Sequence, residues 1–272
     1  MSLTKIATNI DAQWAYQALD GVNKQMASVQ LRLATGKRIN STEDDPAGYQ
    51  LARGLERRSL GLENALTNVT NAKAVMNIAE GGYQNIMDIL LVIKEKAVQA
   101  SDQGLNDTQR TAINEQVSAL LSEIGDIVLE TTFNGDALID GNYSGNFQVG
   151  ESSSNQMAVA IDSASAASLS LGSISLSSAS AASSAVTSVD SAIDTLSESM
   201  QDLGEYKARL TVKESTLSTA INNTNAVRSN IEDADMVKEQ MEMVKLQILQ
   251  QTAGTAFTQA NTSPQLVLQL MR

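Results

Sequence analysis

The chain has 272 residues with a formal net charge of -12 at pH 7; only 3% of the residues are aromatic, and it contains no cysteine and no histidine. The acidic surplus argues against nucleic-acid binding, because neutralising phosphates requires an excess of Lys and Arg. Without cysteine and histidine the chain can form no disulfide, no Ser-His-Asp or Cys-His catalytic set and none of the usual zinc sites. We therefore expect a structural protein and no enzyme, with no catalytic, cofactor-binding or metal-binding residues.

Residues 3–35 are predicted to form an amphipathic helix that ends at Gly36, a favoured C-terminal cap. Its apolar positions recur at spacings of three, four and eight, which places them on one stripe. These positions are Ile6, Ile10, Trp14, Val22, Met26, Val29 and Leu33. The first residues form no apolar run of signal-peptide length, and no stretch approaches the roughly 18 apolar residues of a spanning helix. We expect no cleaved signal and no membrane insertion.

A second, long helix is predicted to begin at Pro46, after a segment rich in N-cap side chains that starts at Asn40. Its apolar residues follow heptad spacing, which is typical of a coiled-coil seam. The seam contains Leu51, Leu55, Leu62, Leu66, Val69, Met76, Ile86, Leu90 and Ile93. A helix over 46–99 would be about 80 Å long and needs a partner of similar length. The Gly81-Gly82 pair is the expected bend.

The middle of the chain changes character several times. A turn is predicted at 101–104, followed by an amphipathic helix around 113–127 that folds back antiparallel on the long helix. Glycine-punctuated, alternating pieces over 133–161 indicate a small β-hairpin. Residues 163–188 are mostly Ser and Ala, which favours a surface loop, either unmodified or carrying O-linked sugars.

Heptads return in the last third of the chain, at every seventh position: Val189, Leu196, Leu203, Leu210 and Leu217. Lys207 and Glu214 interrupt the companion stripe, and polar residues in a seam can fix register and partner. A final helix is expected from the acidic segment at 231–235 to Pro264. Its apolar residues, continued beyond the proline, include Val244, Ile248, Phe257, Leu266 and Leu270.

The predicted fold is mainly α, a long antiparallel helical bundle or coiled coil from both chain ends with a small β-hairpin in the middle. Its expected segments are 1–40, 41–132, 133–188, 189–230 and 231–272. The first carries five basic and two acidic side chains and the last carries three basic and five acidic ones. These opposed charges favour, weakly in salt, the pairing of the two ends.

Several motifs resemble those of bacterial flagellins. The segment Leu33–Gly48 reads LATGKRINSTEDDPAG, and its family-motif residues are Arg38, Asn40, Asp44, Asp45, Pro46 and Gly48. Further matches lie at 96–101, 132–135, 230–235 and 259–272. Only about 50 residues separate the two matching halves, so the chain is similar to a minimal flagellin with core domains alone.

The resemblance implies a structural subunit that polymerises into the bacterial flagellar filament for motility. Segments 1–40 and 231–272 would be inner-tube helices, with 41–132 and 189–230 as the two halves of the helical core domain. The implied partners are other copies of the chain, an export chaperone, hook-associated junction proteins and cap proteins. The implied location is extracellular, after export by the flagellar type III apparatus without a cleaved signal peptide.

The chain departs from the family pattern where a vertebrate Toll-like receptor recognises flagellins. Val92, Lys96 and Gln116 stand where recognised members have arginine, leucine and glutamate. We expect detection by that receptor to be weakened.

Two other functions fit part of the sequence. A hook-filament junction protein shares the Asp-Asp-Pro motif, and a coiled-coil adaptor would share the heptads alone. The carboxylate clusters at 44–45 and 232–235 could serve acid-base or metal chemistry, but both precede helices, where anionic caps are favoured.

Overall fold

The computed structural model describes the backbone of residues 8–270 and the side chains of residues 8–262. The described part of the chain is 73% helical and contains five helices and two small antiparallel hairpins. The predicted mainly α fold is confirmed, with two hairpins where one was expected. The chain forms two compact units. The central unit contains residues 60–222, and the terminal unit contains residues 1–59 together with residues 223–272.

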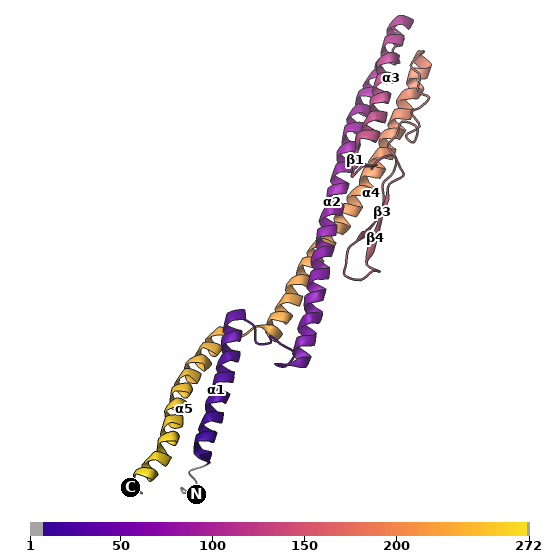
Figure 1. Cartoon of the computed structure of the whole chain (residues 1–272). Helices are drawn as coiled ribbons and strands as arrows, with labels where there is room; N and C mark the ends of the chain where they lie inside the picture. The colour runs from indigo at the N-terminus through magenta and orange to yellow at the C-terminus, as the bar shows by residue number, and fades with distance from the viewer. Residues whose placement is uncertain (1–7, 271–272) are drawn as a thin grey trace. The chain divides into compact units, whose positions relative to one another are not determined.

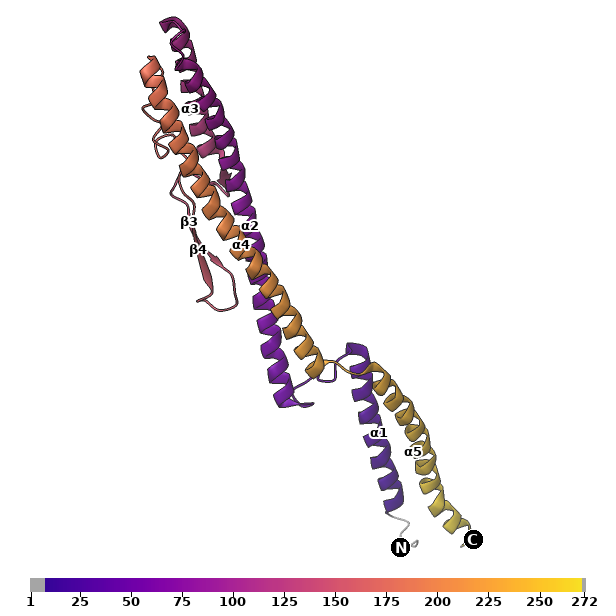
Figure 2. The same cartoon turned by 180° about the vertical axis from the view of Figure 1, so that it is seen from behind.

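Three helices build the central unit: α2 (Pro46–Ala100), α3 (Asp107–Glu130) and α4 (Ala179–Glu232). α2 and α4 lie side by side in both opposite views, and α3 folds back along α2 as predicted (Figures 1 and 2). All three helices contribute to a single continuous core. The facing sides of α2 and α4 are therefore buried within the central unit, from Leu62 on α2 to Leu217 on α4.

Most residues of the predicted seam are buried in this core. They are Leu62, Val69, Met76, Ile86, Leu90, Ile93, Val189, Leu196, Leu203, Leu210 and Leu217. Leu66 is half-buried, and so is Leu55 in the other unit. Leu51 is different: it is 54% exposed, and Ala52 and Ser59 take the buried positions. At the start of α2 the buried position thus lies one residue after the predicted Leu51, at Ala52.

The turn between α2 and α3 is organised by the guanidinium of Arg110. It donates to the carbonyls of Ala100 (Nε, 3.0 Å), Leu105 (Nη1, 2.9 Å) and Asp102 (Nη2, 2.5 Å). The arginine is almost fully buried, and its charged donors satisfy three carbonyl groups of the turn. Asn106 adds a capping box at the start of α3.

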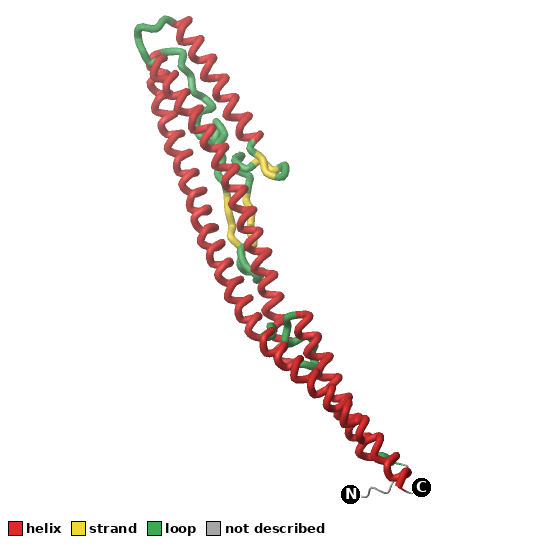
Figure 3. Tube along the Cα trace, turned by 90° about the vertical axis from the view of Figure 1, so that its left-hand side faces the viewer, coloured by secondary structure: helices red, strands yellow, loops and turns green. Residues whose placement is uncertain are grey.

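Two hairpins follow α3 (Figure 3). Strands β1 (Thr132–Phe133) and β2 (Asp136–Ala137) are joined by Asn134 and Gly135, whose φ angles of 53° and 94° suit a tight hairpin turn. The larger hairpin pairs β3 (Ser144–Gln148) with β4 (Gln156–Ala160).

The Gly81-Gly82 pair, which was expected to bend α2, lies inside one uninterrupted helix. Gly81 faces open space, whereas a Cβ on Gly82 would lie 2.8 Å from Thr131 Oγ1 and 2.9 Å from Ile139 Cδ1. Gly82 thus allows the segment after α3 to approach the helix closely.

The Ser-rich segment is shorter as a loop than expected, because α4 already begins at Ala179. Ala182 and Ala185 are buried there and continue the heptads of α4 towards the N-terminus. Small alanines carry little hydrophobic signal, which is why the sequence favoured a loop to 188. The preceding residues are also packed, since Leu169, Leu171 and Leu176 are buried.

Candidate assembly surface

The terminal unit is built on a pair of helices, α1 (Ile10–Thr35) and α5 (Met236–Leu270), which lie side by side (Figure 1). Asn9 caps α1 by accepting from Ala12 N at 3.0 Å, and its Nδ2 donates to the carbonyl of Ala260 on α5 at 2.8 Å. α1 ends at Gly36, as predicted, in the left-handed conformation. α5 continues past Pro264, where the pattern predicted its end, to Leu270.

A pair of helices cannot cover its own apolar side chains. Among the described residues of α1 and α5, only Ala12, Val29 and Leu246 are buried apolar side chains. Large apolar groups stay exposed on both helices: Ile10, Trp14, Tyr16, Leu31, Met236, Val237, Met241, Val244, Ile248 and Leu249. Trp14 is 63% exposed and Val237 is 67% exposed. We call this set the terminal apolar surface.

The structure divides the predicted inner-tube residues between the helix contact and this surface. Val29 is buried in the contact, and Val22, Met26, Leu33 and Phe257 are half-buried. Ile10, Trp14, Val244 and Ile248 belong to the terminal apolar surface instead. Ile6 and the side chains of Leu266 and Leu270 lie outside the described residues.

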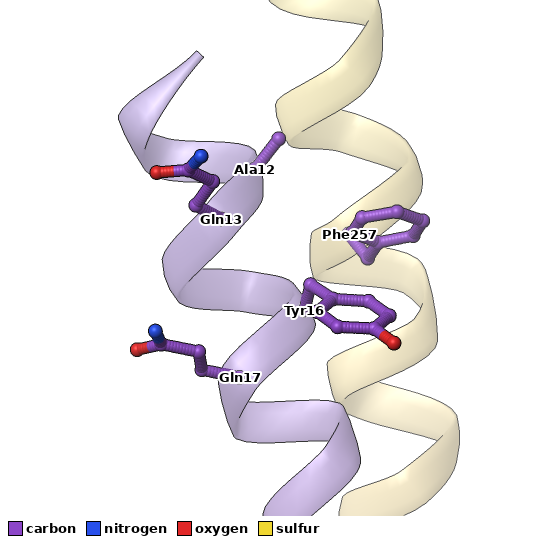
Figure 4. A pocket seen from close by; sticks show the side chains of 5 residues that line it. All are labelled: Ala12, Gln13, Tyr16, Gln17 and Phe257. Atoms are coloured by element: carbon purple, nitrogen blue, oxygen red, sulfur yellow. The ribbon is translucent and has the colours of Figure 1, made fainter. Parts of the chain in front are cut away.

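A shallow open pocket lies on the helix pair, lined by Ala12, Gln13, Tyr16, Gln17 and Phe257 (Figure 4). The rings of Tyr16 and Phe257 meet at a centroid distance of 6.2 Å in a tilted arrangement. The lining of the pocket offers two aromatic rings, the Tyr16 hydroxyl and the neutral amides of Gln13 and Gln17. The pocket suits packing contacts with another protein surface.

The family-motif residues organise the connection between α1 and α2. Asp44 Oδ2 accepts from the backbone N–H groups of Ser41 (2.9 Å) and Asn40 (3.0 Å), and these bonds, Ser41 first, lower the pKa of Asp44. Asp45 Oδ1 accepts from Gly48 N at 3.0 Å, inside the first turn of α2. Asp45 thus caps α2, as the sequence favoured, whereas Asp44 closes the turn at 40–44 that precedes it.

Gly48 itself makes room for a buried side chain. A Cβ at this position would lie 2.7 Å from Ile39 Cδ1, and Ile39 is only 2% exposed. The connection therefore packs directly against the start of α2.

The connection from α1 to α2 pairs with the connection from α4 to α5. Lys37 and Asp233 form an isolated antiparallel bridge, with Arg38 N donating to Glu232 O at 2.6 Å. Lys37 Nζ lies 2.6 Å from Glu232 Oε1, and Arg38 Nη2 donates to the carbonyl of Ile231 at 2.8 Å. Basic residues of one chain end thus meet acidic residues of the other, as their opposed charges predicted.

In the acidic segment before α5, Asp235 caps the helix, whereas Asp233 bonds a side chain of α4. Asp235 Oδ1 accepts from Val237 N at 3.0 Å and Lys238 N at 3.2 Å, and Asp233 Oδ2 accepts from Ser229 Oγ at 2.5 Å.

Among the described residues no group of three or more His, Cys, Asp or Glu side chains is arranged to hold a metal ion. No helix within the same residues is long and apolar enough to span a membrane.

The central unit also exposes large apolar side chains. Leu91, Val92 and Val98 on α2 are 51%, 41% and 52% exposed, and Leu129 at the end of α3 is 68% exposed. Gln116 is exposed, and Lys96 is half-buried. The effect of Val92, Lys96 and Gln116 on receptor recognition stays a prediction. Sequence reasoning missed Leu91 and Leu129, because they fall off the heptad stripe.

Comparison with known proteins identifies the family. The model for the bacterial flagellin N-terminal helical region matches residues 6–144, and the model for the flagellin C-terminal helical region matches residues 186–271. The flagellin of Bacillus subtilis (strain 168) is 30% identical over 303 residues, covering 98% of this chain and 100% of that protein. The flagellin of Halalkalibacterium halodurans is 31% identical over 268 residues, covering 97% of this chain and 98% of that protein.

Other relatives agree with these matches. Flagellin FlaB1 of Treponema pallidum is 29% identical over 281 residues, covering 97% of this chain and 98% of that protein. A solved Vibrio parahaemolyticus protein described as flagellar hook-associated has a TM-score of 0.59 and 12% identity, covering 70% of this chain and 100% of that one, and shows a likeness of fold alone. The two matching regions occupy both helical halves of the chain, which therefore belongs to the bacterial flagellin family.

Proposed function

We propose that the chain is a structural subunit that polymerises into the bacterial flagellar filament and works outside the cell as part of the flagellum. The observation that carries this proposal is the terminal apolar surface on α1 and α5. Most stabilisation of a helix in a protein comes from burial of its apolar face, so an uncovered pair of this size needs further partners. Relatives named flagellin and flagellar filament core protein support other copies of the chain as those partners.

Assembly and ordering of the chain ends are then coupled. Side chains such as Trp14 and Val237 gain burial only when neighbouring subunits cover them, and that gain offsets the entropy of ordering the two helices. Burial contributes about 25 cal/mol per Å² of apolar surface, so many such side chains together favour the polymer strongly.

In this proposal the predicted segments have different roles. Segments 1–40 and 231–272 supply the inner-tube helices, and 41–132 with 189–230 form the surrounding core domain. The seam of α2 and α4 is already buried within one chain, which suits a unit that is folded before assembly. The helices α1 and α5, by contrast, present apolar groups outward.

Membership of the flagellin family also supports partners other than copies of the chain itself. We extend the proposal to an export chaperone, hook-associated junction proteins and a cap protein, and to export by the flagellar type III apparatus without a cleaved signal peptide. A role as the hook-filament junction protein itself is not favoured, because the curated relatives that cover nearly the whole chain carry flagellin or filament names.

Seeded polymerisation tests the proposal. Purified chain is mixed with short filament fragments and imaged by negative-stain electron microscopy, together with Val244→Asp on the terminal apolar surface. Gln116→Asp is the matched control, since it adds the same charge at an exposed site on α3. The native chain and the control should grow long tubes of constant diameter, and Val244→Asp should not, with circular dichroism unchanged. Failure of the native chain to elongate seeds in any salt condition would contradict the proposal.

A further inference from the structure

The apolar seam between α2 and α4 defines which faces meet, but two of its rows carry little information on the alignment along the axis. Its residues repeat at intervals of seven: Ala65, Ala72 and Ala79 on α2, and Leu196, Leu203, Leu210 and Leu217 on α4. Sliding one helix past the other by a heptad, about 10 Å, puts alanine back on alanine and leucine on leucine along these two rows, although the other buried row of α2 changes from Val69 to Met76 and Tyr83. The two repeating rows therefore do not select the register by themselves, and charges beside the seam can contribute to that selection.

Two ion pairs beside the seam can distinguish the native alignment from alignments shifted by a heptad. Lys73 Nζ lies 2.6 Å from Glu214 Oε2. Lys207 Nζ lies 2.5 Å from Glu80 Oε2. The two α2 residues are one heptad apart, as are the two α4 residues, and the basic partner changes helix between the pairs. All four side chains are between 28% and 41% exposed, and pairs of this kind add little net stability.

The alternating polarity penalises both neighbouring alignments. A slide of one heptad in one direction places Lys73 opposite Lys207. A slide in the other direction places Glu80 opposite Glu214. Either slide also breaks both native pairs, so each wrong alignment loses two attractions and gains a repulsion.

A third ion pair between the two helices also favours the native alignment. Lys94 Nζ lies 2.6 Å from Asp190 Oδ1 in the native alignment. A heptad slide would bring Ser183 or Ser197 to the position of the aspartate, so the lysine would lose its partner. We propose that these charged pairs fix the register of α2 against α4 in the central unit by rejecting heptad-shifted alignments.

The proposal predicts different outcomes for variants that keep every native attraction. Exchanging one pair, E80K with K207E, leaves opposite charges in the native alignment but gives both pairs the same polarity. One slide then brings Lys73 opposite the new carboxylate at position 207, the other brings the new ammonium at position 80 opposite Glu214, and neither is repelled. Exchanging the other pair instead, K73E with E214K, has the same consequence. Exchanging both pairs restores the alternation and serves as the matched control.

Engineered cysteines report the register, because the chain has none of its own. One heptad beyond the two ion pairs, Met87 on α2 falls opposite Met200 on α4, and both pack against the core. Met87→Cys with Met200→Cys reports the native alignment. Met87→Cys with Ile193→Cys reports the shifted alignment in which Lys73 meets Lys207. Disulfide yield under mild oxidation, read by mass spectrometry, compares the two.

The expected result is a shifted-pair yield about fivefold higher in each single-exchange variant than in the native background, since one repulsion is replaced by one attraction. The double exchange should match the native background. Equal shifted-pair yields in the native background and in both single exchanges, with circular dichroism showing folded protein, would overturn the proposal. Should one single exchange not fold, the other carries the same test.

Discussion

Adjacent glycines on α2 should respond in opposite directions to alanine. Gly81 has nothing within 4 Å of the position that a methyl group would take, so Gly81→Ala should stabilise the chain by about 0.5–1 kcal/mol through helix propensity alone. At Gly82 the new methyl would meet Thr131 Oγ1 at 2.8 Å, Thr131 Cγ2 at 2.9 Å and Ile139 Cδ1 at 2.9 Å. Overpacking of this kind costs about 1–3 kcal/mol.

The neighbours of Gly82 have little freedom to move away. Thr131 Oγ1 donates to the carbonyl of Ile127 at 2.7 Å, which holds its rotamer, and Ile139 is fully buried. After subtracting the propensity gain, Gly82→Ala should destabilise the chain by up to about 2 kcal/mol. Urea denaturation of the two variants, monitored by circular dichroism, measures both values. Equal effects of the same sign would refute the reasoning, since the two sites share helix, sequence neighbourhood and substitution.

Three further outcomes follow. Arg110→Met should destabilise the chain by about 2–4 kcal/mol, because it removes three hydrogen bonds from a charged donor, one of them buried; thermal unfolding measures the loss. Leu203→Ala should cost about 2–5 kcal/mol in denaturant unfolding, whereas Leu51→Ala, at an exposed site, should stay within about 0.5 kcal/mol. The pKa of Asp44 lies below its ordinary value of 3.8, so its contribution to stability is present above pH 3.8 and is lost as the pH falls through the lower folded pKa. Asp44→Asn should remove that part of the acid dependence, which denaturant unfolding across acid pH would show.

The helical architecture could be predicted because strong signals stand at regular spacing. Heptads of Leu, Ile and Val define the buried face of α2 and α4, and capping residues define where helices begin. The start of α4 was missed because Ala182 and Ala185 are small, although they are buried in the core. The phase error at Leu51 has the same cause, since Ala52 takes the buried position there.

Contacts between residues far apart in the sequence could not be predicted from the periodicity of apolar residues. No spacing rule predicts that Arg110 reaches three carbonyls of the preceding turn, or that Gly82 faces the segment after α3. The assembly surface was predicted only as a stripe. Periodicity does not reveal that Val29 is buried whereas Trp14, on the same stripe, is exposed, because burial depends on where α5 lies.

Trp14 offers the most direct test of the central claim, that other copies of the chain cover the terminal apolar surface. It is the single tryptophan of the chain and is 63% exposed, so its fluorescence reports this surface alone. Emission spectra and acrylamide quenching should be compared between monomers and sedimented filaments grown from seeds. The account predicts a blue shift and strong protection from quenching in the filament. Filaments in which Trp14 stays as accessible as in the monomer would contradict it.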